Sequence, residues 1–287
     1  MIYRELYEKG CSLLTEAGIE EAALDARLLL EYICGTNRND LLVHGERTVE
    51  QEQSELYLRY LAERAKRIPL QHITGIQDFM GLTFQVNEHV LIPRQDTEIL
   101  VEEVLRELHD GMRILDMCTG SGCILISLLH YSNEGVGVGA DISENALSVA
   151  KENAEKILKG AEVSFCQSDL FENITGKYDV IVSNPPYIRS DVIPTLMPEV
   201  KDHEPMQALD GTEDGLYFYR QIVSESKDYL VRGGKLYFEI GHDQAQQVSE
   251  LMKNAGFKEI EVVKDYAGLD RVVYGTYIEA CGRKNER

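Results

Sequence analysis

The chain has 287 residues and a formal net charge of −20; 44% of its residues are hydrophobic and 27% are charged. This composition predicts a soluble globular protein of about two domains, and it excludes a chain that is disordered throughout. The acidic balance disfavours nonspecific binding to DNA or to anionic lipid, because such binding needs a cationic surface.

The cysteines and the start of the chain predict a cytoplasmic protein with reduced thiols. The six cysteines are scattered and form no Cys-x-x-Cys pair, so neither a zinc ribbon nor a dithiol redox site is indicated. The seven histidines show no metal-ligand spacing, and we expect no metal. The first residues lack the order of a signal peptide, and the most apolar stretch, residues 114–129, is too short and too polar to span a bilayer.

Residues 1–66 are predicted to form a small helical bundle. Apolar residues recur at helical spacing in two stripes, Ile2, Leu6, Leu13 and Ala17 and then Leu24, Leu28 and Tyr32. A third helix is predicted from about Val49 to Lys66, and Pro69 ends it.

Residues 67–90 are expected to form a linker with a short β-hairpin. Ile73-Thr74-Gly75 and the run from Phe79 to Phe84 are typical of two strands. Asp96 is then expected to cap a helix that continues to about His109.

From Arg113 onward, strand-like and helix-like segments alternate. Strands are predicted at residues 113–117, 136–140, 163–167, 178–183, 235–240, 259–264 and 271–277. Helices are predicted at residues 123–130, 144–158, 215–230 and 243–254. This alternation predicts βαβ units, whereas the last two strands, joined by only six residues, are expected to pair antiparallel. The predicted fold class is therefore α/β, with a doubly wound, seven-stranded, mostly parallel sheet in residues 91–287.

The strand at residues 113–117 leads into a glycine-containing loop that predicts a cofactor site. In Thr119-Gly120-Ser121-Gly122, the glycines allow a ligand close to the backbone, and the N-terminus of the following helix attracts an anion. An ordinary strand-to-helix turn would look similar. The third glycine of an NAD fingerprint is replaced by Leu125, which weakens that interpretation.

Two acidic residues at strand ends extend this site. Asp141 follows Gly122 by 19 residues, where a carboxylate can accept hydrogen bonds from both hydroxyls of a ribose. Its alternative role is to cap the next helix, for which Ser143 is an equally good candidate. Asp169, after the third strand, is placed by topology to approach an adenine, although a turn residue would occupy the same position. The loop and Asp141 together favour a nucleoside-bearing cofactor.

Asn184-Pro185-Pro186-Tyr187 follows the fourth strand, at the edge where open α/β sheets bind ligands. The prolines stiffen the segment, the Asn184 side chain and the Pro185 backbone each offer a carbonyl acceptor, and Tyr187 can stack on a flat group. Two converging acceptors suit a planar NH₂ group, whose nitrogen lone pair they turn toward a methyl group on a sulfonium. They also stabilise the positive charge that develops on the nitrogen. The tetrad therefore predicts methylation of a planar nitrogen, with a surface turn as the structural alternative.

Taken together, Ile114–Asp116, the loop, Asp141 and Asn184–Tyr187 resemble a class I S-adenosylmethionine-dependent methyltransferase with a Rossmann-like fold. More narrowly, the chain resembles the release factor glutamine methyltransferases (the HemK/PrmC family). The matching stretches are residues 67–75, 91–98, 183–188 and 203–205, followed by Asp265-Tyr266 and Arg271-Val272. The similarity covers nearly the whole chain, including its helical N-terminal part.

The resemblance implies methyl transfer from S-adenosylmethionine, which leaves S-adenosylhomocysteine, to the side-chain amide nitrogen (N5) of a glutamine. That glutamine lies in the Gly-Gly-Gln loop of class 1 peptide chain release factors, the implied partners; direct DNA binding and membrane association are not expected. Cofactor contacts are implied for Thr119, Gly120, Ser121, Gly122, Asp141, Asp169, Leu170 and Asn184. Substrate contacts are implied for Asn184, Pro185, Pro186 and Tyr187, with Asn184, Pro185 and Tyr187 as catalytic residues. The bundle of residues 1–66 is expected to help dock the substrate.

Three residues depart from the family pattern. Cys118 stands where the family usually has the first glycine of the loop, so close backbone approach is in question there. Gln95 replaces the commoner proline after Pro93-Arg94, which touches no inferred chemistry. Leu170 stands where some members carry an aromatic residue, so apolar contact would replace stacking on the adenine.

Three other functions stay open at this point. An adenine-N6 methyltransferase of nucleic acid would use the same Asn184–Tyr187 chemistry, but the charge of −20 and the lack of a basic base-reading domain weigh against it. A non-catalytic binding module on the same fold would not need these acceptors. An NAD oxidoreductase is disfavoured by Leu125.

Overall fold

The computed structural model describes residues 1–278, which divide into two compact units. The first unit contains residues 1–76 and 197–203, and the second contains residues 77–196 and the described residues from 204 onward. The boundary at Ile76 falls within the stretch that the sequence assigns to a linker. Cys281 lies outside the described residues. Residues 1–278 contain no helix with the length and apolar character needed to cross a membrane.

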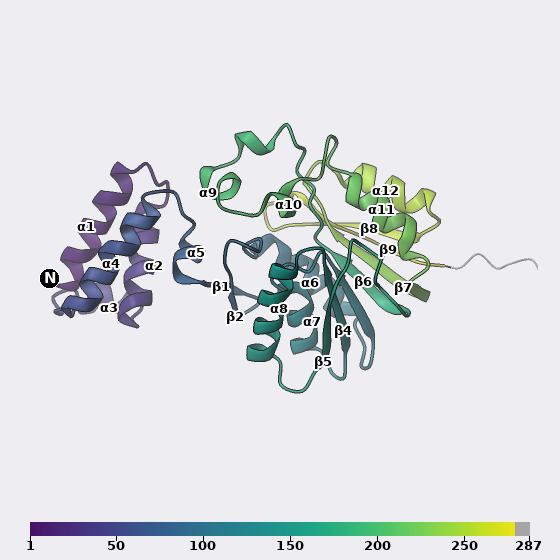
Figure 1. Ribbon diagram of the computed structural model, residues 1–287, viewed down its shortest axis with the longest axis horizontal. Helices are drawn as coiled ribbons and strands as arrows, with labels where there is room; N and C mark the ends of the chain where they lie inside the picture. The colour runs from purple at the N-terminus through teal and green to yellow at the C-terminus, as the bar shows by residue number, and fades with distance from the viewer. Residues whose placement is uncertain (279–287) are drawn as a thin grey trace, which may run out of the picture. The chain divides into compact units, whose positions relative to one another are not determined.

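The first unit is helical. Its longer helices are α1 (Tyr3–Glu16), α2 (Ala22–Cys34) and α4 (Gln51–Arg64), labelled in Figure 1. They enclose a core that includes Leu6, Leu14, Leu29, Tyr57 and Leu61, each with an exposed fraction of 0%. Three short helices complete the unit: α3 (Arg38–Val43), α5 (Leu70–Thr74) and α9 (Pro198–Lys201).

Helix α9 belongs to this unit although it is distant in sequence, because a buried arginine binds it to the bundle. Arg64 Nε lies 2.7 Å from Asp25 Oδ2, and Arg64 Nη2 lies 3.0 Å from Glu199 Oε1. A buried guanidinium needs such partners, since an unpaired charge would be costly to desolvate.

The predicted β-hairpin is present, but both strand predictions are wrong in their bounds: the first lies too early, and the run from Phe79 to Phe84 contains the turn as well as part of each strand. Ile73 and Thr74 belong to α5, because Ile73 packs into the core of the helical unit, and Gly75 ends that helix with a φ of 75°. The hairpin consists of β1 (Ile76–Phe79) and β2 (Leu82–Gln85). Met80 and Gly81 join the strands with positive φ values of 51° and 71°, as a tight two-residue turn requires.

The second unit contains a seven-stranded sheet with the order β5-β4-β3-β6-β7-β9-β8. Its strands are β3 (Arg113–Met117), β4 (Val136–Asp141), β5 (Glu162–Gln167), β6 (Tyr178–Ser183), β7 (Leu230–Glu239), β8 (Lys258–Lys264) and β9 (Asp270–Thr276). β3 to β7 are parallel, and β9 is antiparallel to both β7 and β8. The predicted doubly wound, mostly parallel sheet with an antiparallel final pair is confirmed.

The two faces of the sheet bury alternate residues of each strand. On β6, Val180 and Val182 belong to one core cluster, and Ile181 belongs to the other. Helices α6 (Gln95–Glu107), α7 (Cys123–Tyr131) and α8 (Glu144–Ile157) contribute to the first cluster. Helices α11 (Tyr217–Ser226) and α12 (Ala245–Asn254) contribute to the second. Two short segments, the 3₁₀ helix η1 (Ile193–Thr195) and α10 (Met206–Leu209), lie in the connection between β6 and α11.

Helix α6 begins two residues earlier than a cap at Asp96 would place it, so the expected cap is wrong. Arg94 occupies the N-cap position without a side-chain hydrogen bond, and Asp96 lies in the first turn. The Asp96 carboxylate instead lies 3.2 Å from Arg271 Nη2 on β9.

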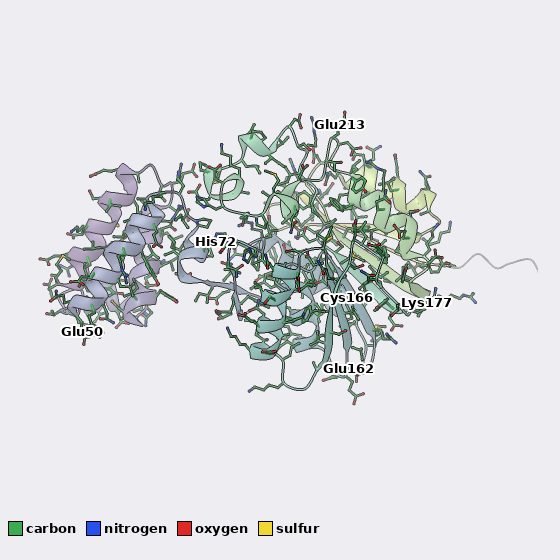
Figure 2. The ribbon with its side chains drawn as sticks, viewed as in Figure 1. Glu50, His72, Glu162, Cys166, Lys177 and Glu213 are labelled. Atoms are coloured by element: carbon green, nitrogen blue, oxygen red, sulfur yellow. The ribbon has the colours of Figure 1, made fainter. Side chains whose placement is uncertain are left out.

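Exposed charged side chains occur in both units. Figure 2 labels Glu50 in the first unit and Glu162, Lys177 and Glu213 in the second.

Candidate active site

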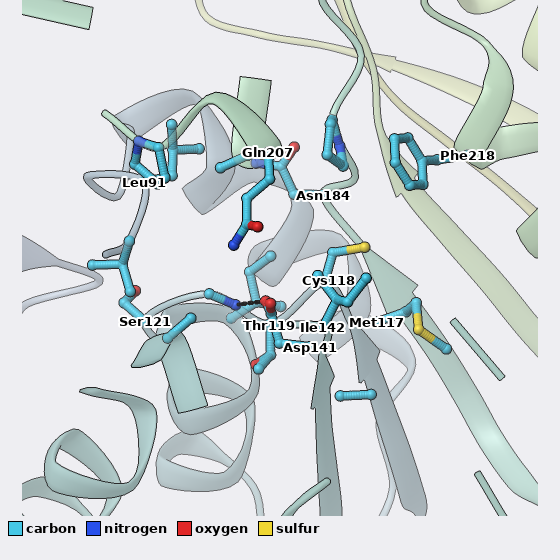
Figure 3. Close-up of a pocket in the computed structure, with 18 of the residues that line it drawn as sticks. Leu91, Met117, Cys118, Thr119, Ser121, Asp141, Ile142, Asn184, Gln207 and Phe218 are labelled. Atoms are coloured by element: carbon cyan, nitrogen blue, oxygen red, sulfur yellow. Dashed lines mark hydrogen bonds between the residues drawn. The ribbon is translucent and has the colours of Figure 1, made fainter. Parts of the chain in front are cut away.

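A cavity of about 670 Å³ opens at the carboxyl ends of β3, β4 and β6. The strand order reverses there: the strand that follows β3 in the chain, β4, lies on one side of β3, and β6 lies on its other side. Such a reversal leaves a crevice in which doubly wound proteins bind ligands. Figure 3 shows Thr119, Asp141 and Asn184 in the wall of this cavity.

The loop between β3 and α7 needs left-handed backbone at alternate positions. The φ values are 64° at Cys118, 56° at Gly120 and 80° at Gly122. Gly120 has no atom within 4 Å of where a Cβ would stand, so its backbone is open to the cavity. At Gly122, by contrast, a Cβ would lie 2.8 Å from Ile126 Cδ1 and 3.2 Å from Ala150 Cβ. Gly120 thus permits approach of a ligand, whereas Gly122 permits close packing of α7 and α8.

Cys118 adopts the conformation that favours glycine, although it carries a side chain. Holding a non-glycine residue in this region costs on the order of 1–3 kcal/mol, which only a well-determined surrounding structure sustains. The loop therefore has the left-handed backbone that a glycine would allow, although Cys118 replaces the glycine that the family usually has here. Burial raises the pKa of the Cys118 thiol, so it is a small apolar group in the cavity wall rather than a thiolate.

A buried carboxyl group, that of Asp116, holds the loop by a hydrogen bond. Asp116, at the end of β3, is fully buried, and Thr119 Oγ1 donates a hydrogen bond of 2.6 Å to its Oδ2. Burial raises the pKa of Asp116 to about 7, while the hydrogen bond from Thr119 opposes that rise. Thr119 N also donates to the carbonyl of Ala140, at 3.0 Å. Thr119 lines the cavity, but its hydroxyl hydrogen is committed to Asp116.

Asp141, the last residue of β4, presents a carboxylate to the cavity. Gly120 N donates to Oδ2 and Ser143 N donates to Oδ1, each at 2.9 Å (Figure 3 draws the first). A carboxylate can accept about four hydrogen bonds, so about two acceptor positions stay open. Burial raises the pKa of Asp141, and neighbouring backbone N–H groups, chiefly those of Ser143 and Gly120, oppose this. The capping alternative does not apply, because Ser143 Oγ caps α8 by accepting from Ala146 N at 3.2 Å.

Asp169 and Leu170 follow β5 and also line the cavity. Asp169 is exposed, whereas Leu170 is half-buried with a φ of 46°. Ser168 Oγ donates to the Leu170 carbonyl at 2.6 Å, which fixes this turn. Leu170 therefore offers an apolar side chain to the same cavity as Asp141.

Only part of the tetrad after β6 lines the cavity. Asn184 and Pro186 line the cavity, and Pro185 and Tyr187 do not. The Tyr187 hydroxyl donates to Glu239 Oε1 at 3.3 Å, and burial raises the pKa of Tyr187. The stacking of Tyr187 on a substrate amide thus stays a prediction.

Several cavity residues were not identified from the sequence. Leu91, Arg94 and Thr97 form part of the wall, as do Gln207 of α10 and Phe218 of α11. Figure 3 shows the Gln207 side chain directed into the cavity, above Thr119 and Asp141. Leu91, Arg94 and Thr97 lie in the stretch 91–98, which carries part of the family resemblance and is a signal for them. Gln207 and Phe218 lie outside the matching stretches and give no such signal.

One buried carboxylate joins the stretch 91–98 to the segment that precedes α10. Glu204, 6% exposed, accepts a hydrogen bond from Ile92 N at 3.2 Å and one from Arg94 Nη2 at 2.6 Å. Burial raises the pKa of Glu204, and Arg94 opposes the rise.

The donor set of the cavity fits an adenosyl cofactor. Asp141 has acceptor positions for ribose hydroxyls, Gly120 leaves its backbone open, and Leu170 and Ile142 offer apolar surface for a flat base. Among residues 1–278, no group of three or more His, Cys, Asp or Glu side chains is arranged to hold a metal ion.

Comparison with known proteins agrees with this geometry. Residues 5–75 match the family described as PrmC N-terminal domain, and residues 94–197 match the Methyltransferase small domain family. The chain is 44% identical over 270 residues to the release factor glutamine methyltransferase of Clostridium acetobutylicum, covering 92% of this chain and 95% of that protein. It is 41% identical over 278 residues to that of Clostridium botulinum, covering 95% and 98%. A crystal structure of a methyltransferase from Pyrococcus furiosus shares the fold, with a TM-score of 0.54 at 16% identity over 75% of this chain and 98% of that one. The chain therefore belongs to the release factor glutamine methyltransferase family.

Proposed function

We propose that the protein transfers a methyl group from S-adenosylmethionine to the N5 amide nitrogen of the glutamine in the Gly-Gly-Gln loop of class 1 peptide chain release factors. One observation carries the proposal. Asn184 and Pro186 of the amide-binding tetrad line the same cavity as Asp141 and the glycine-containing loop. One of the two candidate amide acceptors, Asn184, therefore lies in the same cavity as the candidate binding groups for the methyl donor.

Cofactor binding is assigned to the walls described above. Asp141 would accept hydrogen bonds from the ribose hydroxyls, and the backbone at Thr119–Gly122 would face the amino acid portion. Asp169 and Leu170 would meet the adenine, Leu170 by apolar contact. When bound, S-adenosylmethionine supplies a methyl group on a positively charged sulfur, and S-adenosylhomocysteine is the product.

The chemical work of the chain is orientation and charge stabilisation. Asn184 Oδ1 and the Pro185 carbonyl would accept the two N–H hydrogens of the substrate amide, which directs the nitrogen lone pair. Both acceptors are fixed before the reaction, so they stabilise the positive charge that develops on the nitrogen. The amide proton would leave after transfer, and no metal is needed for this reaction.

The helical unit is assigned to substrate docking, because none of the candidate chemical groups lies in it. Since release factors act on the ribosome, we infer that the protein works in the cytoplasm.

The test is to locate the transferred methyl group. The protein is mixed with labelled S-adenosylmethionine and either a release factor or adenine-containing DNA, and the label is mapped by mass spectrometry. We expect it on the glutamine of the Gly-Gly-Gln loop. A label on adenine would favour the nucleic-acid methyltransferase, and the absence of transfer with bound cofactor would favour a binding module.

Asn184→Ala tests the assigned site. We expect it to bind S-adenosylhomocysteine with nearly unchanged affinity by calorimetry, but to lose most turnover, because one of the two amide acceptors is gone. Asn254→Ala, an exposed position at the end of α12, is the matched control. Methylation of a release factor by Asn184→Ala at the wild-type rate would contradict the assignment.

A further inference from the structure

A buried acidic residue that the proposed chemistry does not use lies directly behind the tetrad. Glu239, the last residue of β7, has an exposed fraction of 2%. Its Oε1 accepts the hydrogen bond from the Tyr187 hydroxyl at 3.3 Å. The Thr97 hydroxyl on α6 stabilises the charged form of this carboxylate, whose buried Oε2 accepts no hydrogen bond from the described residues. Glu239 thus contacts the tetrad through Tyr187 and interacts electrostatically with the helix α6.

The charge on Glu239 has a nearby counterion. Burial raises the pKa of Glu239, while Thr97, the positive charge of Arg271 and Tyr187 oppose the rise. Arg271 is itself held by two carboxylates, with Nη2 3.0 Å from Asp265 Oδ2 and 3.2 Å from Asp96 Oδ2. Asp265 therefore helps to hold the positive charge of Arg271 near Glu239. Both positions carry part of the family resemblance.

The direction of the hydrogen bonds follows from the chemistry of a carboxylate. An ionised carboxylate only accepts, so the Tyr187 hydroxyl hydrogen points toward Glu239, and the same negative charge favours a Thr97 hydroxyl whose hydrogen is turned toward it. The Thr97 oxygen accepts from Asn184 Nδ2, which lies 3.5 Å away. When the Asn184 amide nitrogen donates to Thr97, the amide oxygen stays free to accept a hydrogen bond from the substrate.

We propose that Glu239 and Thr97 are positioning residues that hold the Asn184 amide with its nitrogen toward Thr97 and its oxygen available to the substrate. The inference rests on the proposed function, in which Asn184 Oδ1 accepts from the glutamine amide. The reversed amide would present donors to the donors of the substrate and would lose that hydrogen bond. Glu239 also fixes Tyr187 at its hydroxyl, while Gln244 Nε2 holds the Tyr187 carbonyl at 3.1 Å.

The test compares two substitutions of Thr97. Thr97→Val removes the hydroxyl at nearly constant volume, and Thr97→Ser keeps the hydroxyl. We expect Thr97→Val to lower kcat for release factor methylation about tenfold to hundredfold, the usual range for a lost buried hydrogen bond. KM should change much less, because most of the substrate protein binds elsewhere. Thr97→Ser should restore most of kcat, and Thr83→Val, at an exposed position of β2, is the matched control.

A second variant addresses the carboxylate itself. Glu239→Gln keeps the shape but places an NH₂ donor against the two hydroxyls, which reverses the direction of the network. Arg271 keeps its pairs with Asp96 and Asp265, so we expect a folded protein with reduced kcat. Calorimetric affinity for S-adenosylhomocysteine should stay at the wild-type value in both variants, since neither group is assigned to the cofactor.

The outcomes separate this inference from the function on which it rests. If wild-type protein does not methylate glutamine, or if Asn184→Ala stays active, the proposed function fails. If those results hold but Thr97→Val and Glu239→Gln keep the wild-type kcat, only the positioning role is overturned. A loss in Thr97→Ser as large as that in Thr97→Val, with weakened S-adenosylhomocysteine binding, would also overturn it, because it would indicate general damage to the site.

Discussion

Replacing Asp141 by alanine tests the cofactor assignment most directly. The carboxylate accepts one backbone N–H on each oxygen, from Gly120 and Ser143, and about two acceptor positions stay open toward the cavity. In the proposed complex these positions bind the ribose hydroxyls. In Asp141→Ala, water and the cofactor compete for the space, and both ribose hydrogen bonds are lost.

The magnitude follows from those two hydrogen bonds. Hydrogen bonds to charged groups contribute about 1.5–3 kcal/mol each, and replacement by water returns part of this. We therefore expect S-adenosylmethionine binding to weaken by on the order of 1–3 kcal/mol, which corresponds to roughly 5-fold to 150-fold in Kd.

Calorimetry with S-adenosylmethionine measures the change, and Glu144→Ala, an exposed carboxylate in the first turn of α8, controls for the lost charge. Adenosine and 2′,3′-dideoxyadenosine then separate a ribose contact from general damage to the loop. Wild-type protein should prefer adenosine, and Asp141→Ala should distinguish the two ligands much less. An unchanged Kd for S-adenosylmethionine, or an undiminished preference for adenosine in folded Asp141→Ala, would refute the ribose assignment.

Two further predictions concern the loop. Gly122→Ala should lower the free energy of unfolding by about 1–4 kcal/mol in urea titrations, because the new side chain has a φ of 80° and is crowded against Ile126. Gly160→Ala is the control: its φ is 85° but the space around it is open, so it should lower the free energy of unfolding less. Equal losses in the two variants would contradict the role of crowding. Asp116→Asn should change the pH dependence of stability. Burial raises the pKa of Asp116 to about 7, so the folded state favours its protonated form, and this contribution to stability is lost as pH rises from about 4 toward 7. The stability of Asp116→Asn relative to wild type should therefore increase over that interval, and a constant difference would contradict the origin assigned to the shift.

Local patterns predicted the sheet well. Strands such as β3 and β6 have the expected bounds, because a buried parallel strand is an apolar run with clear turn residues at its ends. The start of the hairpin was wrong, since Ile73 has high strand propensity but packs into the helical core. Propensity describes the residue alone, whereas the packing partner decides its structure.

The site was predictable where chemistry follows a strand directly. Asp141 and Asn184 each lie at or just after the end of a parallel strand, so the topology alone brings them to one edge. The hydrogen bonds behind Asn184 were not predictable, because Thr97 and Glu239 come from elements far apart in sequence. Neither residue type is distinctive, and only the folded chain shows that both lie beside the tetrad.

The internal hydrogen bonds of the loop after β3 have a consequence for ligand affinity. Asp116 holds Thr119, Asp141 holds Gly120, and Gly122 fits closely beside α8, so the chain's own contacts fix the loop. A nucleoside arriving from solvent thus meets a rigid receptor whose ordering entropy was already lost when the chain folded. Almost none of its intrinsic binding free energy has to be diverted into shaping this segment.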